Sequence, residues 1–322
     1  MKRFTRSFSM LALAAGAALT FSACKKDKQE EPNTVVNAVV NNGYSTLATL
    51  VTNAGLIDTL NGTGPFTVFA PQNSAFTGVT APTGAALRNL LQYHVIRGTV
   101  GGSVLTAQQA IALSNGNLVR LATMNGDSVF VRASSSAGVF INGVQVVQPD
   151  LSANNGVVHG INRILMPPVG NIVQTAQATP GFDSLVKAVV RVSTGATGAD
   201  NILEVLSTTN GLTVFAPTNA AFQALFANAA FPFRNIDAIP VGTLRTVLRH
   251  HVVNARAFSN DLRNGNLAMA NGSNAVVAGV GGAAITISGS GTVFNNGAAG
   301  IALTNIMARN GVLHVIDRVI IP

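Results

Sequence analysis

The chain has 322 residues, of which 48% are hydrophobic and 10% are charged, so it is long enough for about two domains and too apolar for extensive disorder. It has 32 glycines, two tyrosines and no tryptophan, a composition that favours strands and turns. The formal net charge of +8 suggests nucleic-acid binding, but Lys2, Arg3 and Arg6 supply three of these charges at one end. The remaining cations are too sparse for a basic surface, and we expect no nucleic-acid partner.

The first 24 residues have the layout of a secretory signal. The cations at positions 2, 3 and 6 precede an apolar run over residues 10–21, which is too short to span a membrane as a helix. Residues 21–24 (FSAC) resemble the lipobox of bacterial lipoproteins, in which the cysteine is acylated and becomes the first mature residue. This resemblance implies a signal peptide over 1–23 and a palmitate-type anchor on Cys24, the only cysteine. The alternatives are an ordinary signal peptide with a chance cysteine, or a buried thiol.

Residues 24–33 form the next segment, with six charged side chains and no large apolar group. Such a segment cannot bury enough apolar surface to become ordered, so we expect a solvated tether. Removal of the signal leaves seventeen cations and twelve acidic groups, a net charge of +5. The tether resembles those of lipoproteins on the outer surface of some Gram-negative bacteria, which implies an outer-membrane location in the cell envelope with exposure at the surface.

Three sequence blocks occur twice in the same order. Residues 66–76 and 212–222 are identical at eight of eleven positions, and the other two pairs are residues 90–96 with 247–253 and residues 155–167 with 310–322. Because the repeat is about 150 residues long, it indicates tandem domains rather than a solenoid. We place domain 1 at 34–168 and domain 2 at 169–322, with the boundary at two consecutive prolines, Pro167 and Pro168.

Each copy changes from helical to strand periodicity along its length. Leu87, Leu90, Leu91 and His94 have the spacing of one helix face, and residues 244, 247, 248 and 251 repeat it. Residues 67–70 and 213–216 read as buried strands.

Three further patterns complete the secondary-structure prediction. Asn73 and Asn219, with Gln72 or Thr218 beside them, follow the buried strands and are predicted to cap the helices that carry Phe76 and Phe222. Residues 157–165 and 312–321 read as central strands, and short apolar segments such as 129–131, 139–141, 284–287 and 292–294 predict hairpins. The fold class is therefore α+β.

These blocks closely resemble the fasciclin domain family in their residues, order and separation. The resemblance implies two tandem domains, each a β-sandwich or wedge wrapped by several helices. It also implies a secreted or membrane-anchored protein that is not an enzyme and acts in adhesion or matrix contact. The family's Tyr-His pair is intact at Tyr93-His94, but domain 2 has His250-His251 in its place.

Six residues are candidates for partner contact. They are Tyr93, His94, His250, His251, Asp150 and Leu151. The Asp150-Leu151 pair resembles segments linked to receptor binding in animal members of the family, and the alternative is a turn aspartate before a buried leucine. For the histidines, a core role with satisfied hydrogen bonds is favoured over metal binding, because no ligand spacing is present. We therefore expect no metal and no cofactor.

The sequence supports one leading function and two alternatives. The leading hypothesis is a lipid-anchored surface protein that contacts extracellular or envelope proteins or matrix through its two domains. A polysaccharide-binding or envelope accessory protein is the alternative, although the scarcity of polar aromatic residues disfavours sugar stacking. A hydrolase is the third, but no nucleophile motif or paired carboxylates support it.

Overall fold

The computed structural model describes residues 33–279, 285–289 and 298–322. The predicted signal peptide and the lipidation site Cys24 lie outside the described residues, as does the predicted strand at 292–294. Pro32–Pro322 form one compact unit, within which two sheets mark the two domains.

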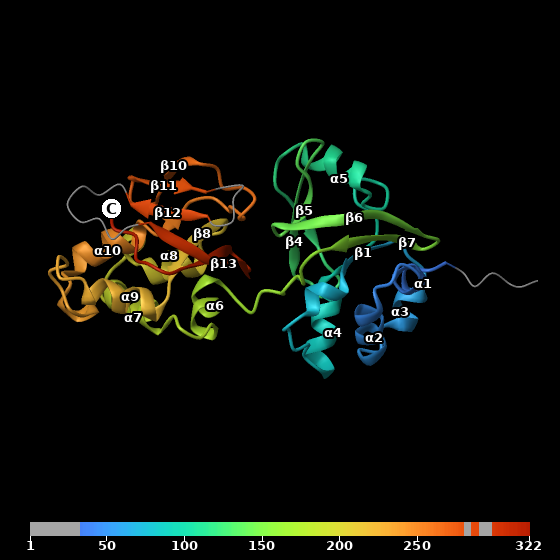
Figure 1. Cartoon of the computed structure of the whole chain (residues 1–322), viewed down its shortest axis with the longest axis horizontal. Coiled ribbons are helices and arrows are strands. Elements are labelled where there is room, and N and C mark those ends of the chain that lie inside the picture. The colour runs from blue at the N-terminus through green and yellow to red at the C-terminus, as the bar shows by residue number, and fades with distance from the viewer. Residues whose placement is uncertain (1–32, 280–284, 290–297) are drawn as a thin grey trace, which may run out of the picture. The chain divides into compact units, whose positions relative to one another are not determined.

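Domain 1 has helices at its start and a strand-rich second half, as the periodicity predicts (Figure 1). Its helices are α1 (Val35–Asn41), α2 (Ser45–Asn53), α3 (Ile57–Asn61), α4 (Gly84–Tyr93) and α5 (Ala107–Ser114). Its strands are β1 (Phe66–Pro71), β2 (Val95–Arg97), β3 (Val119–Ala122), β4 (Ser128–Ser134), β5 (Gly138–Ile141), β6 (Val144–Ala153) and β7 (Gly156–Ile161). A 3-10 turn, η1 (Asn73–Phe76), follows β1.

Domain 2 repeats the order of the strands, but it has the helix α9 in the place of η1 and, among its described residues, no counterpart of α5. Its helices are α6 (Ile172–Ala178), α7 (Asp183–Ser193), α8 (Ile202–Thr208), α9 (Asn219–Ala227) and α10 (Val241–Arg249), with 3-10 turns η2 (Gly198–Asp200) and η3 (Ile236–Ala238). Its strands are β8 (Leu212–Pro217), β9 (Val252–Val253), β10 (Gly265–Ala268), β11 (Asn274–Ala278), β12 (Thr286–Gly289), β13 (Ala299–Ala308) and β14 (Gly311–Ile316).

Each domain has a seven-stranded sheet, in the order β2-β1-β7-β6-β5-β4-β3 and β10-β11-β12-β13-β14-β8-β9. The pairs β1–β7 and β8–β14 are parallel, and the other pairs are antiparallel. The sheet of domain 1 curls until its two ends meet. The contact between the ends is a hydrogen bond in which the N–H of Met124, after β3, donates to Val95 O of β2 at 2.8 Å. In domain 2 the N–H of Ala270 donates to Val252 O at 2.7 Å in the same way.

Two apolar cores lie on opposite faces of the central strands. In domain 1, Phe66, Val68 and Ala70 of β1 pack with α1–α4, whereas Phe69 packs with the inner face of β4, β5 and β7. In Figure 1 the helices α2, α3 and α4 lie on one side of β1 and β7, and β4 to β6 lie on the other. All six residues of β1 and of β8 are buried, which explains why every residue of these strands except Thr67 and Thr213 is apolar.

The predicted elements next to the repeated blocks are present, and two predicted caps are not. The predicted helices end at the histidines, since His94 is the C-cap of α4 and α10 ends one residue before His250. The predicted strands at 157–165 and 312–321 are central but end at Ile161 and Ile316.

The predicted role of Asn73 and Asn219 as caps of the helices that follow them is wrong. Their side-chain oxygens instead accept hydrogen bonds from Thr46 N at 3.1 Å and Ser184 N at 2.8 Å, at the starts of α2 and α7. The cap of α9 is Thr218, whose hydroxyl accepts from Ala221 N.

Candidate functional site

His94 and His251 occupy the same internal position in the two domains. The Nδ1 of His94 lies 2.8 Å from Leu90 O, and its Nε2 accepts from Leu165 N at 2.9 Å. For His251 the partners are Val247 O at 2.7 Å and Ile320 N at 2.9 Å. Since a carbonyl can only accept and a backbone N–H can only donate, each ring is neutral with its proton on Nδ1. Burial lowers the pKa of both imidazoles to about 4.

His159 and His314 bridge different segments with the opposite tautomer. Their Nε2 atoms lie 2.6 Å from Leu105 O and 2.9 Å from Ala257 O, and their Nδ1 atoms face the backbone N–H of residues 150 and 305. Each ring stacks on a phenylalanine of the central strand, with centroids 5.9 and 5.5 Å apart. Burial lowers the pKa of His159, and it lowers that of His314 to about 4. Four of the five histidines therefore hold segments together.

The Tyr93 position differs between the domains. The Tyr93 hydroxyl donates to Ser128 O at 3.0 Å and accepts from Asn142 Nδ2 at 2.9 Å, and burial raises its pKa. In domain 2 the Nδ1 of His250 lies 2.8 Å from Ser273 Oγ. Its buried Nε2 has no hydrogen-bond partner among the described residues.

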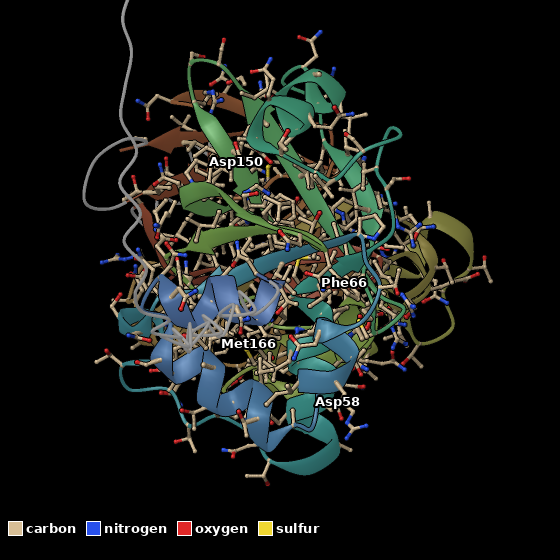
Figure 2. All side chains as sticks on the ribbon, turned by 90° about the vertical axis from the view of Figure 1, so that its right-hand side faces the viewer. Asp58, Phe66, Asp150 and Met166 are labelled. Atoms are coloured by element: carbon tan, nitrogen blue, oxygen red, sulfur yellow. The ribbon has the colours of Figure 1, made fainter. Side chains whose placement is uncertain are left out.

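Asp150 lies at a bulge in β6 and has a side chain that reaches solvent. Its φ of +60° places it in the left-handed region, and Asn305 of β13 has φ of +63°. The Asp150 Oδ1 accepts from Ala107 N at 2.8 Å, at the start of α5, and its side chain is 43% exposed. Leu151 is partly buried against the core on the helical side. Figure 2 shows Asp150 at the sheet end of domain 1, far from Asp58 at the helical end.

The structure therefore separates the six candidate residues. Tyr93, His94, His250 and His251 are all buried, with exposed fractions of 2% or less. A partner can reach these four only if the domain opens, and their contacts are internal. Of the six, Asp150 alone places a charged group at the surface.

Sequence reasoning missed Asn155 and Asn310, which begin the closing block of each copy. The side chain of Asn155 accepts from Val35 N and donates to Leu60 O and Gly62 O. Asn310 accepts from Ile172 N and donates to Leu206 O and Thr209 O. Recurrence in both copies was the available signal, but the partners are 93 to 138 residues away in sequence and could not be read from it.

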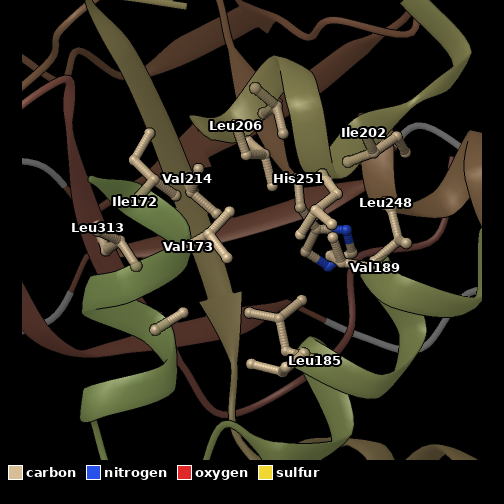
Figure 3. A pocket seen from close by; sticks show the side chains of 14 residues that line it. Ile172, Val173, Leu185, Val189, Ile202, Leu206, Val214, Leu248, His251 and Leu313 are labelled. Carbon is tan, nitrogen blue, oxygen red and sulfur yellow. The ribbon is translucent and has the colours of Figure 1, made fainter. Parts of the chain in front are cut away.

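A small apolar cavity lies beside the buried histidine in each domain. In domain 2 its volume is about 30 Å³, and aliphatic side chains of α6, α7, α8 and β8 surround His251 there (Figure 3). The matching cavity of domain 1, beside His94, has about 20 Å³. Since both nitrogens of each histidine are already bonded, these spaces are packing voids with room for a methyl group and not for a ligand.

An open groove in domain 1 is the best candidate contact site, and we call it the polar groove after the hydrogen-bonding groups that lie among its largely apolar lining. It has a volume of about 640 Å³ and lies beside the bulge of β6. Its polar lining includes Thr63, Thr106, Asp150, Ser152, Asn154 and Asn155, and no aromatic side chain contributes. A carboxylate next to hydroxyl and amide groups suits a polar, hydrogen-bonding partner such as a peptide segment.

Neither a metal site nor a membrane helix is found in the part of the chain that the structure describes. Among residues 33–279, 285–289 and 298–322, no three His, Cys, Asp or Glu side chains are grouped to hold a metal ion. No helix in these ranges is both long enough and apolar enough to cross a membrane.

A family model described as the fasciclin domain matches residues 42–167 and 184–322. Periostin of Homo sapiens is 25% identical over 267 residues, which cover 83% of this chain and 29% of periostin. Transforming growth factor-beta-induced protein ig-h3 of Sus scrofa is 28% identical over 293 residues, 91% of this chain and 38% of that protein. The chain thus spans less than two fifths of these animal relatives.

Two further similarities concern a shorter protein and a solved structure. An uncharacterized protein of Synechocystis sp. is 32% identical over 143 residues, 42% of this chain and 98% of that protein. The solved structure of a FAS1 domain pair from the insect cell adhesion molecule fasciclin I aligns with 88% of this chain and 98% of that chain. Its TM-score is 0.40 and its identity 19%.

Proposed function

We propose, on the premise that this chain belongs to the fasciclin domain family, that it is a lipid-anchored surface protein that mediates adhesion. It would contact extracellular or envelope proteins or matrix, without catalysis. Fasciclin domains are linked to cell adhesion and matrix contact in the relatives. The observation that carries the proposal is the match of both domains to this family, in a chain whose motif residues are committed to internal hydrogen bonds.

Within this proposal, the polar groove of domain 1 is the contact surface. Asp150 presents a half-exposed carboxylate there, whereas the domain 2 residue at this position, Asn305, is uncharged. A protein partner with a basic or amide group suits this lining. A polysaccharide partner is the second candidate, and the absence of aromatic lining in the groove counts against sugar stacking.

The contact proposal is tested by Asp150→Asn in cells that display the protein. The amide keeps an oxygen for Ala107 N, as Asn305 keeps one for Ser259 N, so the fold is retained while the charge is lost. We expect surface attachment to weaken about tenfold, the effect of losing one charge-assisted hydrogen bond. Asp58→Asn, which removes the same charge at the helical end, is the matched control. Equal attachment of the two variants would contradict the groove as the contact surface.

Anchoring is tested separately through Cys24. Cys24→Ala should abolish incorporation of a palmitate analogue and release the protein from the membrane fraction. Unchanged membrane fractionation would contradict the lipid anchor, and protease treatment of intact cells would test whether the domains are exposed. Glycan-array binding by the folded domains would favour the polysaccharide alternative instead.

A further inference from the structure

One loop position carries a different side chain in the two domains. Leu105 N and Ala257 N both donate to a threonine of the central strand, Thr67 or Thr213, at 3.2 and 2.8 Å. Two residues later, Ala107 N and Ser259 N donate to Asp150 and Asn305. The residues between these anchors therefore correspond, and Thr106 of domain 1 is Phe258 in domain 2.

Phe258 is buried against domain 1. Only 1% of its surface is exposed, and its ring lies 6.2 Å from that of Phe130 on β4. Phe258 belongs to a small apolar cluster that also includes Met307 of β13 and Leu118 of domain 1. The guanidinium of Arg256 lies 4.1 Å above the Phe130 ring. Aromatic and cation–π contacts of this kind stabilise an interface beyond the area that they bury.

Two ion pairs join the same surfaces. Arg132 Nε of β4 lies 2.6 Å from Asp261 Oδ1, whose side chain is only 8% exposed. The two atoms are close, but their angles do not form a hydrogen bond, so the attraction is mainly between charges. Arg309 Nε lies 3.1 Å from Asp127 Oδ1 at the more exposed end. Separation of the domains would break both ion pairs, and the Arg132–Asp261 pair is the more sheltered from solvent of the two.

Gly143, in the turn between β5 and β6, shows how closely the surfaces approach. A Cβ at this position would lie 2.5 Å from Asn305 Nδ2 and 2.9 Å from Phe258 Cβ. Its φ of +75° also favours glycine. Gly138, at the other end of β5 where the β4–β5 turn enters the strand, has φ of +82° and nothing within 4 Å of a built Cβ. The two glycines therefore have the same backbone requirement, and only Gly143 has the interdomain contact.

We propose that the 256–261 loop, with Phe258 at its centre, is a docking surface that binds the β4–β5 face of domain 1 and holds the two domains as one rigid body. The same position in domain 1 carries Thr106 in place of the aromatic anchor, and its surface stays open as the polar groove. One copy of the fold thus uses this surface for its neighbour, and the other copy leaves it available. This inference does not depend on the proposed function.

The experiment measures the distance between spin labels on the two domains. The full chain with Cys24→Ser has no other cysteine, so Thr52→Cys on α2 and Val190→Cys on α7, both at exposed positions, can be labelled selectively. We expect one narrow distance distribution in this parent and in Gly138→Ala. Gly143→Ala should broaden the distribution about twofold or more, because domains without a firm interface move independently.

Two outcomes with the parent chain and the glycine variants would overturn the proposal. One is a broad distribution in the parent chain, and the other is the same distribution in Gly143→Ala and Gly138→Ala. Phe258→Thr, which places the domain 1 residue in domain 2, is the second variant if Gly143→Ala does not fold. This variant should broaden the distance distribution while the circular dichroism spectrum of the chain stays that of the parent. An unchanged narrow distribution would also contradict the proposal.

Discussion

The two domains share the hydrogen bonds of four motif histidines and differ at the Tyr93 position and at their surfaces. His94 and His251 bridge a helix end to the last residues of their domain with distances that agree within 0.1 Å. At position 150 or 305 the backbone conformation is the same, but the side chain is a carboxylate in one domain and an amide in the other. The repeated motif therefore specifies the interior, while the positions that face outward have acquired separate roles.

The largest expected effect is an unequal loss of stability in acid. The pKa values of His94, His251 and His314 are about 4 in the folded protein, against 6.5 in the unfolded chain, and those of His159 and His250 are also lowered. Because the folded values are depressed, stability is fully present above about pH 6.5 and is lost as the pH falls from there towards 4. Each histidine whose pKa falls to about 4 on folding lowers the free energy of unfolding by up to about 3 kcal/mol in acid.

Domain 2 should lose more stability in acid than domain 1, since it holds three of the five histidines. Burial raises the pKa of Asp261, which opposes this loss in domain 2 but involves one group only. Amide hydrogen exchange at pH 7 and pH 5, corrected for intrinsic rates, would measure each domain separately. An equal loss of protection in both domains between pH 7 and pH 5 would contradict the comparison.

Replacing either bridging histidine should cost nearly the same free energy. His94→Ala leaves Leu165 N and a helix carbonyl unpaired inside the protein, and His251→Ala does the same to Ile320 N. We expect a loss of about 3 kcal/mol in the free energy of unfolding for each domain. Urea unfolding checks this, with Asp58→Asn as a surface control. A cost near zero in one domain and not the other would show that the two sites are not equivalent.

At the Tyr93 position, replacement by phenylalanine should cost more stability in domain 1 than in domain 2. Tyr93→Phe removes the hydroxyl that joins Ser128 O to Asn142, and we expect a loss of about 1–2 kcal/mol. His250→Phe should change stability by less than about 1 kcal/mol, because Ser273 and Asn271 already bond to each other and Nε2 has no partner among the described residues. Thermal unfolding of both variants measures the difference. Costs of similar size would mean that His250 has a bonding role like that of Tyr93.

The smallest effect concerns the two cavities. Val214→Ile adds one methylene beside the 30 Å³ void of domain 2, and Val68→Ile does so beside the 20 Å³ void of domain 1. We expect Val214→Ile to stabilise its domain by about 0.5–1 kcal/mol and Val68→Ile by less, since the smaller void accepts the group with more strain. Denaturant midpoints would check the order, and the reverse order would contradict the cavity comparison.

The repeated blocks gave enough information for the domain count, the fold class and the elements next to the motifs. The helix stripe ending at His94 and the buried strand of residues 67–70 depend on local periodicity, which is visible in the sequence. The partners of Asn73 and Asn155 are not local, because these side chains cap helices and loops that reach them only after folding. The exposure of Asp150 and the burial of Phe258 depend on which domain surface is covered, and no periodicity encodes that.

The central claim is that the motif histidines are neutral internal bridges with defined tautomers. Nuclear magnetic resonance of the imidazole nitrogens tests it directly. The account predicts that His94 and His251 carry their proton on Nδ1 and that His159 and His314 carry it on Nε2, with no titration of His94, His251 and His314 between pH 8 and about pH 5. Titration of His94 or His251 near pH 6.5, or fast exchange between tautomers, would contradict it.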